Sequence, residues 1–238
     1  MIVSRKHEFL FFELPRTGTT SIRNKLIDEN IGEISRRIHR HGSISKYRRI
    51  FGNEFIDYKI ISCLRNPMDR VLSLYLKLKR DHNNYFSKLE CKERKTILEV
   101  RTLRRYRDIQ NNDLSFEDYF LKYFRMPYVD WMYFDMSSCD EIIKFENLQE
   151  DFTKVVNKQN IDIDDSLAMK NKLKDKPHFI EFYTPRIRKR AMFIFSIYMK
   201  KTGYEFPEDW PSHKESVFQK IAMFFSLRLY KLVNLNLK

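Results

Sequence analysis

The sequence predicts an α/β fold in which helices flank a central parallel sheet. The order strand, turn, helix occurs twice, over residues 8–30 and over residues 58–79. Parallel strands joined through helices build sheets of this kind. Of the 238 residues, 42% are hydrophobic and 15% aromatic, with only five Gly and seven Pro. This composition supplies a sizeable core and excludes disordered and collagen-like chains.

The first strand–turn–helix unit begins with a short apolar run. Residues 8–14 (EFLFFEL) are typical of a buried strand, which ends before Pro15. A polar turn, PRTGTTS, follows, and residues 21–30 then have the apolar spacing of a helix.

The second unit has the same order. Residues 58–64 (YKIISCL) predict a strand, and residues 68–79 predict a helix. Pro67 suits the first helical turn, where its missing N–H costs nothing. The remaining predicted elements are a strand over 141–145 and helices over 147–157, 186–202 and 217–235.

The chain contains no internal repeat and no evident linker. We therefore expect a single domain over residues 1–212, followed by an amphipathic helix within residues 213–238. That helix is apolar on a broad face and carries several basic side chains. Two placements fit this pattern: packing on the domain, or peripheral contact with an anionic membrane surface.

The charge balance predicts an anionic partner. Lys and Arg number 45 and Asp and Glu 32, which gives a net charge of +13. Cys63, Cys91 and Cys139 form no Cys-x-x-Cys pair, which favours reduced thiols over disulfides or a zinc site. The N-terminal apolar run is too short for a signal peptide, and no run reaches the roughly 20 apolar residues of a membrane span. We expect a cytoplasmic protein.

The first turn has the composition of a phosphate or sulfate cradle. Gly18 lets the backbone approach a ligand, and the following helix offers free N–H groups and its positive dipole end. Polar donors surround this glycine: Arg16, Thr17, Thr19, Thr20 and Ser21. The turn is not a Walker A loop, because it lacks the first Gly and the Lys before Thr or Ser. An ordinary Thr-rich strand–helix turn is the alternative.

The second turn offers another anion-binding pair. Arg65 follows the predicted strand at its carboxyl end, where open α/β sheets bind ligands. Ser73 lies about two helical turns further on. We therefore expect Arg65 and Ser73 to hold an anion together.

Together these turns resemble a known family. PRTGTTS and the pattern R-x-P-x-x-R-x-x-S-x-Y over residues 65–75 are similar to motifs of the sulfotransferases that use 3′-phosphoadenosine 5′-phosphosulfate (PAPS). KFENL at 144–148 looks like a further family motif. FYTP at 182–185 and TGYEF at 202–206 look like the carboxy-terminal pattern of the carbohydrate-type, family 2-like branch.

This resemblance implies a P-loop-like three-layer fold and a PAPS-dependent sulfotransferase. Such an enzyme moves the sulfuryl group to a hydroxyl of a carbohydrate or glycan and releases PAP, with no metal required. By the same resemblance, the first loop binds the 5′-phosphosulfate, and Arg16 neutralises charge on the leaving oxygen. Arg65 and Ser73 bind the 3′-phosphate. The expected donor-binding residues are Arg16, Thr17, Gly18, Thr19, Thr20, Ser21, Arg65 and Ser73.

The general base has three candidates. A neutral imidazole can accept the proton of the acceptor hydroxyl near pH 7. His41 looks like the histidine that precedes a short helix in several relatives, and His39 is its neighbour. Glu13, at the end of the first predicted strand, is the other choice. We rank His41 first, Glu13 second and His39 third.

Two other functions compete with sulfuryl transfer. A P-loop nucleotide kinase-like phosphotransferase shares the expected fold but needs the missing GK[ST] sequence. A basic nucleic-acid or membrane-binding module would account for the net charge of +13. It leaves both anion-binding turns unexplained, so we expect no nucleic-acid partner.

Overall fold

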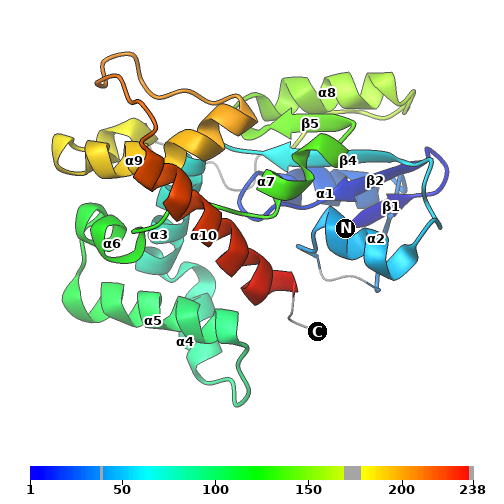
Figure 1. Ribbon diagram of the computed structural model, residues 1–238. Helices are drawn as coiled ribbons and strands as arrows, with labels where there is room; N and C mark the ends of the chain where they lie inside the picture. Colours follow the sequence, from blue (N-terminus) through cyan, green and yellow to red (C-terminus); the bar gives the residue numbers. More distant parts are fainter. Residues whose placement is uncertain (38–39, 169–177, 236–238) are drawn as a thin grey trace. The chain divides into compact units, whose positions relative to one another are not determined.

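The structure is a computed structural model that describes residues 1–37, 40–168 and 178–235 (Figure 1). Within it the chain forms two compact units. The first unit comprises Met1–Asn66, Val129–Lys176 and Leu227–Lys238, and the second comprises Pro67–Tyr128 and Pro177–Ser226.

The first unit contains a five-stranded sheet of order β3-β1-β2-β4-β5. Its elements are, in chain order, β1 (Ile2–Ser4), β2 (Phe9–Phe12), α1 (Thr19–Asp28), β3 (Glu33–Ile34), α2 (Ile44–Phe51), β4 (Lys59–Leu64), α7 (Met132–Asp135), η2 (Met136–Ser138), β5 (Glu141–Lys144), η3 (Phe145–Asn147) and α8 (Leu148–Lys158). Strands β2, β4 and β5 run parallel, as the two predicted strand–turn–helix units require.

The prediction of an α/β fold is confirmed, but the sheet is mixed rather than wholly parallel. Strand β1 pairs antiparallel with both β2 and β3. The sequence signal for β1 was weak, because its three residues are followed at once by the charged turn that leads into β2. The finer expectation of a P-loop-like three-layer arrangement stays a prediction.

Successive residues of β2 face opposite sides of the sheet, as in any strand. Phe9 and Phe11 join an apolar cluster with side chains of α1 and α8, including Ile22 and Phe152. Phe12 points to the other side, where its ring meets Tyr47 of α2 and Trp131 edge-on, with centroids 5.5 and 6.4 Å away. Both faces of the sheet are therefore covered within this unit.

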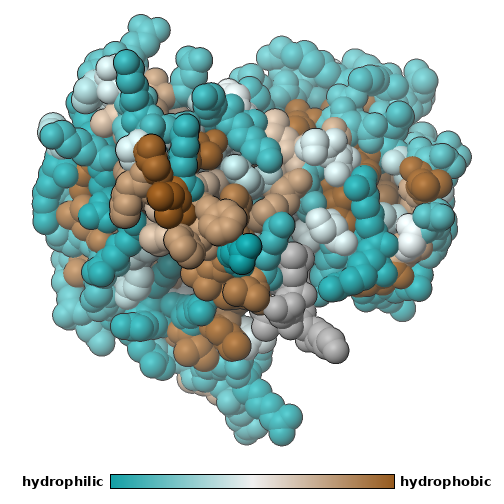
Figure 2. Space-filling view, viewed as in Figure 1, coloured by the Kyte–Doolittle hydropathy of each residue, from teal (hydrophilic) through white to brown (hydrophobic). Residues whose placement is uncertain are grey.

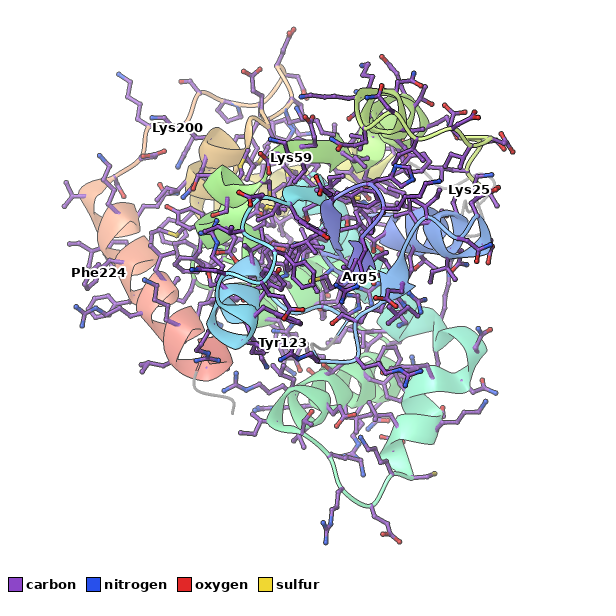
Figure 3. All side chains as sticks on the ribbon, turned by 90° about the vertical axis from the view of Figure 1, so that its right-hand side faces the viewer. Arg5, Lys25, Lys59, Tyr123, Lys200 and Phe224 are labelled. Atoms are coloured by element: carbon purple, nitrogen blue, oxygen red, sulfur yellow. The ribbon has the colours of Figure 1, made fainter. Side chains whose placement is uncertain are left out.

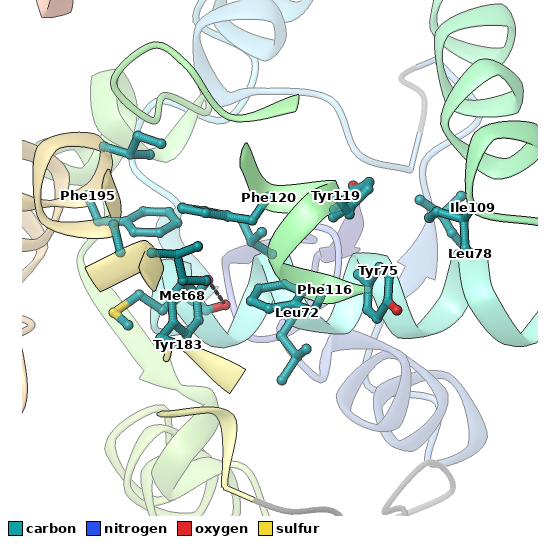
Figure 4. Close-up of a cluster of buried hydrophobic side chains, with 14 of the residues drawn as sticks. Met68, Leu72, Tyr75, Leu78, Ile109, Phe116, Tyr119, Phe120, Tyr183 and Phe195 are labelled. Atoms are coloured by element: carbon teal, nitrogen blue, oxygen red, sulfur yellow. Dashed lines mark hydrogen bonds between the residues drawn. The ribbon is translucent and has the colours of Figure 1, made fainter. Parts of the chain in front are cut away.

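The second unit is helical. Its elements are α3 (Pro67–Arg80), η1 (His82–Asn84), α4 (Tyr85–Glu90), α5 (Ile97–Asn112), α6 (Phe116–Tyr123), η4 (Phe179–Phe182) and α9 (Pro185–Thr202). Figure 4 shows part of its core, in which aromatic side chains of α6 and α9 pack against α3. The Tyr183 hydroxyl, buried in this core, donates to the carbonyl of Met68 at 2.9 Å.

The last helix, α10 (Val217–Leu235), has the bounds that the sequence predicts. The boundary between the two units, Ser226 to Leu227, falls within it. The division into residues 1–212 and 213–238 stays a prediction. Among the described helices, none combines the length and apolar character needed to cross a bilayer.

Candidate functional site

Glu13 lies directly after β2 and is buried, with 1% of its surface exposed. Arg40 Nε donates to Glu13 Oε2 at 2.6 Å, and Arg23 Nε lies 3.8 Å from Oε1. A buried carboxylate needs such partners, because its desolvation is otherwise uncompensated. Glu13 therefore holds Arg40 and Arg23 beside the start of the loop that follows.

The loop between Glu13 and α1 has a constrained backbone. Arg16 and Gly18 both have positive φ, of 68° and 76°, a region that residues other than glycine seldom adopt. Thr17 is buried, and its hydroxyl donates to the carbonyl of Leu14 at 2.7 Å. A Cβ at Gly18 would lie 2.9 Å from Leu148 Cδ2 and 3.0 Å from Phe145 Cδ2. Only glycine fits this position.

Helix α1 begins directly after Gly18 in a way that suits an anion. Gly18 is its N-cap residue, and no side chain caps the helix. The first N–H groups of a helix have no partner within the helix, and its dipole makes this end positive. The first turn also contains no acidic residue that would repel an anion. The loop can therefore present backbone donors to a phosphate or sulfate group.

The hydroxyl groups of the loop serve different purposes. Ser21 Oγ donates to the carbonyl of Ala168 at 2.9 Å, so it ties α1 to a distant segment, as Thr17 ties the loop to Leu14. Thr20 Oγ1 instead accepts from Arg40 Nη2 at 3.0 Å. Its own proton is then directed elsewhere, and Thr20 is exposed. Arg40 and Thr20 thus form a donor pair at the helix start.

Arg65 supports this loop from the end of β4. Its Nη1 donates to the carbonyl of Arg16 at 3.0 Å, and only 7% of the residue is exposed. The guanidinium lies over the ring of Phe145, 3.9 Å from its centroid. Glu146 Oε1 accepts the backbone N–H of Asn66 at 2.8 Å. The KFENL segment therefore packs against both of the turns for which anion binding is predicted.

His41 lies next to Arg40, just before α2. Its Nδ1 is 2.9 Å from the carbonyl oxygen of Glu13. Since a carbonyl oxygen only accepts, Nδ1 must carry a proton in this contact, and in the neutral ring Nε2 then holds the lone pair. The fold thus selects the tautomer in which Nε2 can act as a base. Helix α2 starts beside it, with Ser43 as N-cap accepting from Lys46 N–H at 3.2 Å.

For two predicted site residues, a place in this cluster stays a prediction. His39 lies outside the described residues. Ser73 is half-buried on α3, in the second unit, while Arg65 belongs to the first. The pairing of Arg65 with Ser73 stays a prediction.

Two of the three cysteine thiols have raised pKa values. Burial raises the pKa of the Cys63 thiol well above its usual value and that of Cys139 to about 12, so both thiols are protonated near neutral pH. Across residues 1–37, 40–168 and 178–235, no cluster of three or more His, Cys, Asp or Glu side chains could hold a metal ion.

Sequence reasoning missed Arg40, which joins Glu13 to Thr20. It stands in the run RRIHRH, and a basic run ordinarily indicates a solvated surface. Its position beside His41 was the signal that could have identified it. Phe145 and Glu146 belonged to a recognised motif, but their function as supports of Arg65 and Asn66 is visible only in three dimensions.

One of three comparisons with known proteins gives a match. A model of the sulfotransferase family matches residues 1–232 of this chain. No curated protein and no solved structure gives a significant match.

Proposed function

The chain belongs to the sulfotransferase family, and from this premise we propose that it transfers the sulfuryl group of PAPS to a hydroxyl group of a carbohydrate or glycan. The observation that carries the proposal is the loop between Glu13 and α1. Its Gly18 has no room for a side chain, and the uncapped start of α1 directs backbone N–H groups outward. Such a site binds tetrahedral anions.

In this proposal the donor's phosphosulfate lies against the loop. The N–H groups at the start of α1, the Thr20 hydroxyl and the side chain of Arg16 bind its oxygens. Thr17 acts through its backbone, because its hydroxyl proton is engaged by the carbonyl of Leu14. Ser21 holds the start of α1 in place, because its N–H donates to the carbonyl of Gly18 at 3.1 Å and its hydroxyl to that of Ala168. Arg65 fixes the carbonyl of Arg16 and so the shape of the loop. Positioning and charge stabilisation of this kind provide most of the rate in related group transfers.

The acceptor hydroxyl attacks sulfur in line with the bond to the nucleotide phosphate. Its proton passes to Nε2 of His41 while the acceptor oxygen forms the new S–O bond. The old S–O bond breaks, and its electron pair stays on the phosphate oxygen of PAP. Arg16 and the positive end of α1 stabilise the charge that develops there.

His41 is the preferred base because of its tautomer. Its Nδ1 contact with the Glu13 carbonyl leaves the lone pair on Nε2. The carboxylate of Glu13, in contrast, is buried and paired with Arg40. We assign Glu13 to positioning: its carbonyl orients His41, and its carboxylate orients Arg40.

The acceptor class rests on the sequence. FYTP and TGYEF resemble the carbohydrate-type branch of the family, and the net charge of +13 suits an acidic glycan. A nucleotide kinase remains the weaker alternative, because the loop has no lysine before its Thr and Ser residues.

The predicted 3′-phosphate contact can be tested with Ser73→Ala. The variant should bind PAP about 10- to 100-fold more weakly, because a hydrogen bond to a charged group contributes about 1.5–3 kcal/mol. Its affinity for 5′-AMP, which lacks the 3′-phosphate, should not change. Calorimetric titration of both nucleotides measures the difference. Equal losses for PAP and AMP, or no loss for either, would contradict a contact between Ser73 and the 3′-phosphate.

A further inference from the structure

Helix α10 exposes a continuous row of large apolar side chains. This apolar face consists of Val217 (75% exposed), Phe218 (70%), Ile221 (50%), Phe224 (50%), Phe225 (58%), Leu229 (59%) and Leu232 (62%). At 3.6 residues per turn these positions fall within an arc of about 140°. Figure 2 shows hydrophobic side chains gathered over α10, and Figure 3 shows Phe224 projecting outward from it.

The opposite face of α10 is buried, although its side chains are smaller and more polar than those of the apolar face. It contains Gln219, Ala222, Met223 and Ser226, all less than a tenth exposed. An ordinary surface helix buries its large apolar residues and exposes its polar ones. In α10 this arrangement is reversed.

Buried hydrogen bonds fix the helix in this rotation. The side chain of Gln219 is fully buried, and its Nε2 donates to the carbonyl of Phe193 at 2.6 Å and to Ser196 Oγ at 2.5 Å. His213 Nε2 lies 2.9 Å from Gln219 Oε1. A rotation of the helix that buried the apolar face would break these hydrogen bonds and leave the Gln219 amide without them. The exposure of the apolar face is therefore built into the fold.

The charge of α10 identifies the kind of surface that would cover this face. The helix contains no Asp or Glu, and its basic residues, Lys220, Arg228 and Lys231, are exposed. Aromatic and aliphatic side chains on one face, with basic side chains beside them, are the pattern of helices that bind anionic bilayers. A second copy of the same face would supply no counter-charge.

We propose that the apolar face of α10 docks onto an anionic lipid bilayer. The apolar side chains enter the boundary between headgroups and acyl chains, and the basic side chains meet lipid phosphates. This function is independent of the sulfuryl transfer proposed above.

Sedimentation of the full-length protein with vesicles tests the proposal. The wild type should pellet with vesicles of phosphatidylcholine and phosphatidylserine, and much less with phosphatidylcholine alone. The triple variant Phe218→Ser/Phe225→Ser/Leu229→Ser should partition at least about tenfold less, since burial of each large apolar side chain favours binding. Lys220→Glu should weaken binding to the anionic vesicles several-fold, and added salt should do the same.

A matched control distinguishes vesicle binding through α10 from binding through any exposed apolar side chains. Ile97 and Val100 of α5 are 58% and 53% exposed, so Ile97→Ser/Val100→Ser removes similar side chains elsewhere and should pellet like the wild type. The thermal midpoint of each variant shows that it is folded. Three outcomes would overturn the proposal: no pelleting of the wild type, equal pelleting of the triple variant, or a dimer in gel filtration that the triple variant abolishes without any lipid binding.

Discussion

Replacing His41 by asparagine lowers kcat by about 10²–10⁴-fold, the usual contribution of a general base. The asparagine amide can still donate to the Glu13 carbonyl, as Nδ1 of the histidine does. The loop and helix α1 are left intact, so the affinity for PAP should not change. Rates of PAP formation at saturating PAPS, with calorimetric affinities for PAP, measure the two effects separately.

Glu13→Gln tests the alternative that Glu13 is the general base. Glu13 has a positioning function in this scheme, so its replacement should loosen Arg40 and lower both PAP affinity and stability. Unchanged kcat in His41→Asn, combined with loss of kcat but intact PAP affinity in Glu13→Gln, would transfer the function of base to Glu13.

Replacing Gly18 by alanine weakens PAP binding by about tenfold or more and destabilises the fold. Positive φ alone costs an L-residue about 1–2 kcal/mol. The new Cβ would also meet Leu148 and Phe145 at 2.9 and 3.0 Å, an overlap that costs roughly a further 1–3 kcal/mol. Relief of that overlap moves the loop away from α8 and disturbs its N–H groups. Urea unfolding and PAP titration measure the two effects.

Gly203→Ala is the matched control. Gly203 also has positive φ, of 70°, but nothing lies within 4 Å of a Cβ built there. Its replacement therefore isolates the backbone cost, and PAP affinity should be unaffected. If Gly18→Ala and Gly203→Ala were equally stable and equally good at binding PAP, the close packing of the loop would have no functional importance.

Much of the fold could be predicted because its signals are local. Short stretches of sequence contain the spacing of apolar residues that predicts β4, α3, α9 and α10. They also contain the turn residues around Gly18 and Pro67. Strand β1 was missed because a three-residue strand has too few positions to show alternation. Its antiparallel pairing depends on contacts with β2 and β3 that no local pattern contains.

The candidate site, like the fold, could be predicted only in part from the sequence. The loop and His41 were predicted from local motifs, but the orientation of each side chain depends on distant partners. Arg65 follows β4 as expected, but only the structure shows that its Nη1 donates to the carbonyl of Arg16 and that its buried guanidinium lies over the ring of Phe145. The bounds of α10 follow from its sequence, whereas its rotation depends on the bonds of Gln219 to α9.

Titration of PAP into the wild-type protein in the presence of EDTA tests the central claim most directly. A loop that binds the donor through backbone N–H groups, Arg16 and Thr20 predicts one site of micromolar affinity that needs no metal ion. Absence of PAP binding, together with saturable binding of Mg·ATP, would contradict the assignment and favour a phosphotransferase.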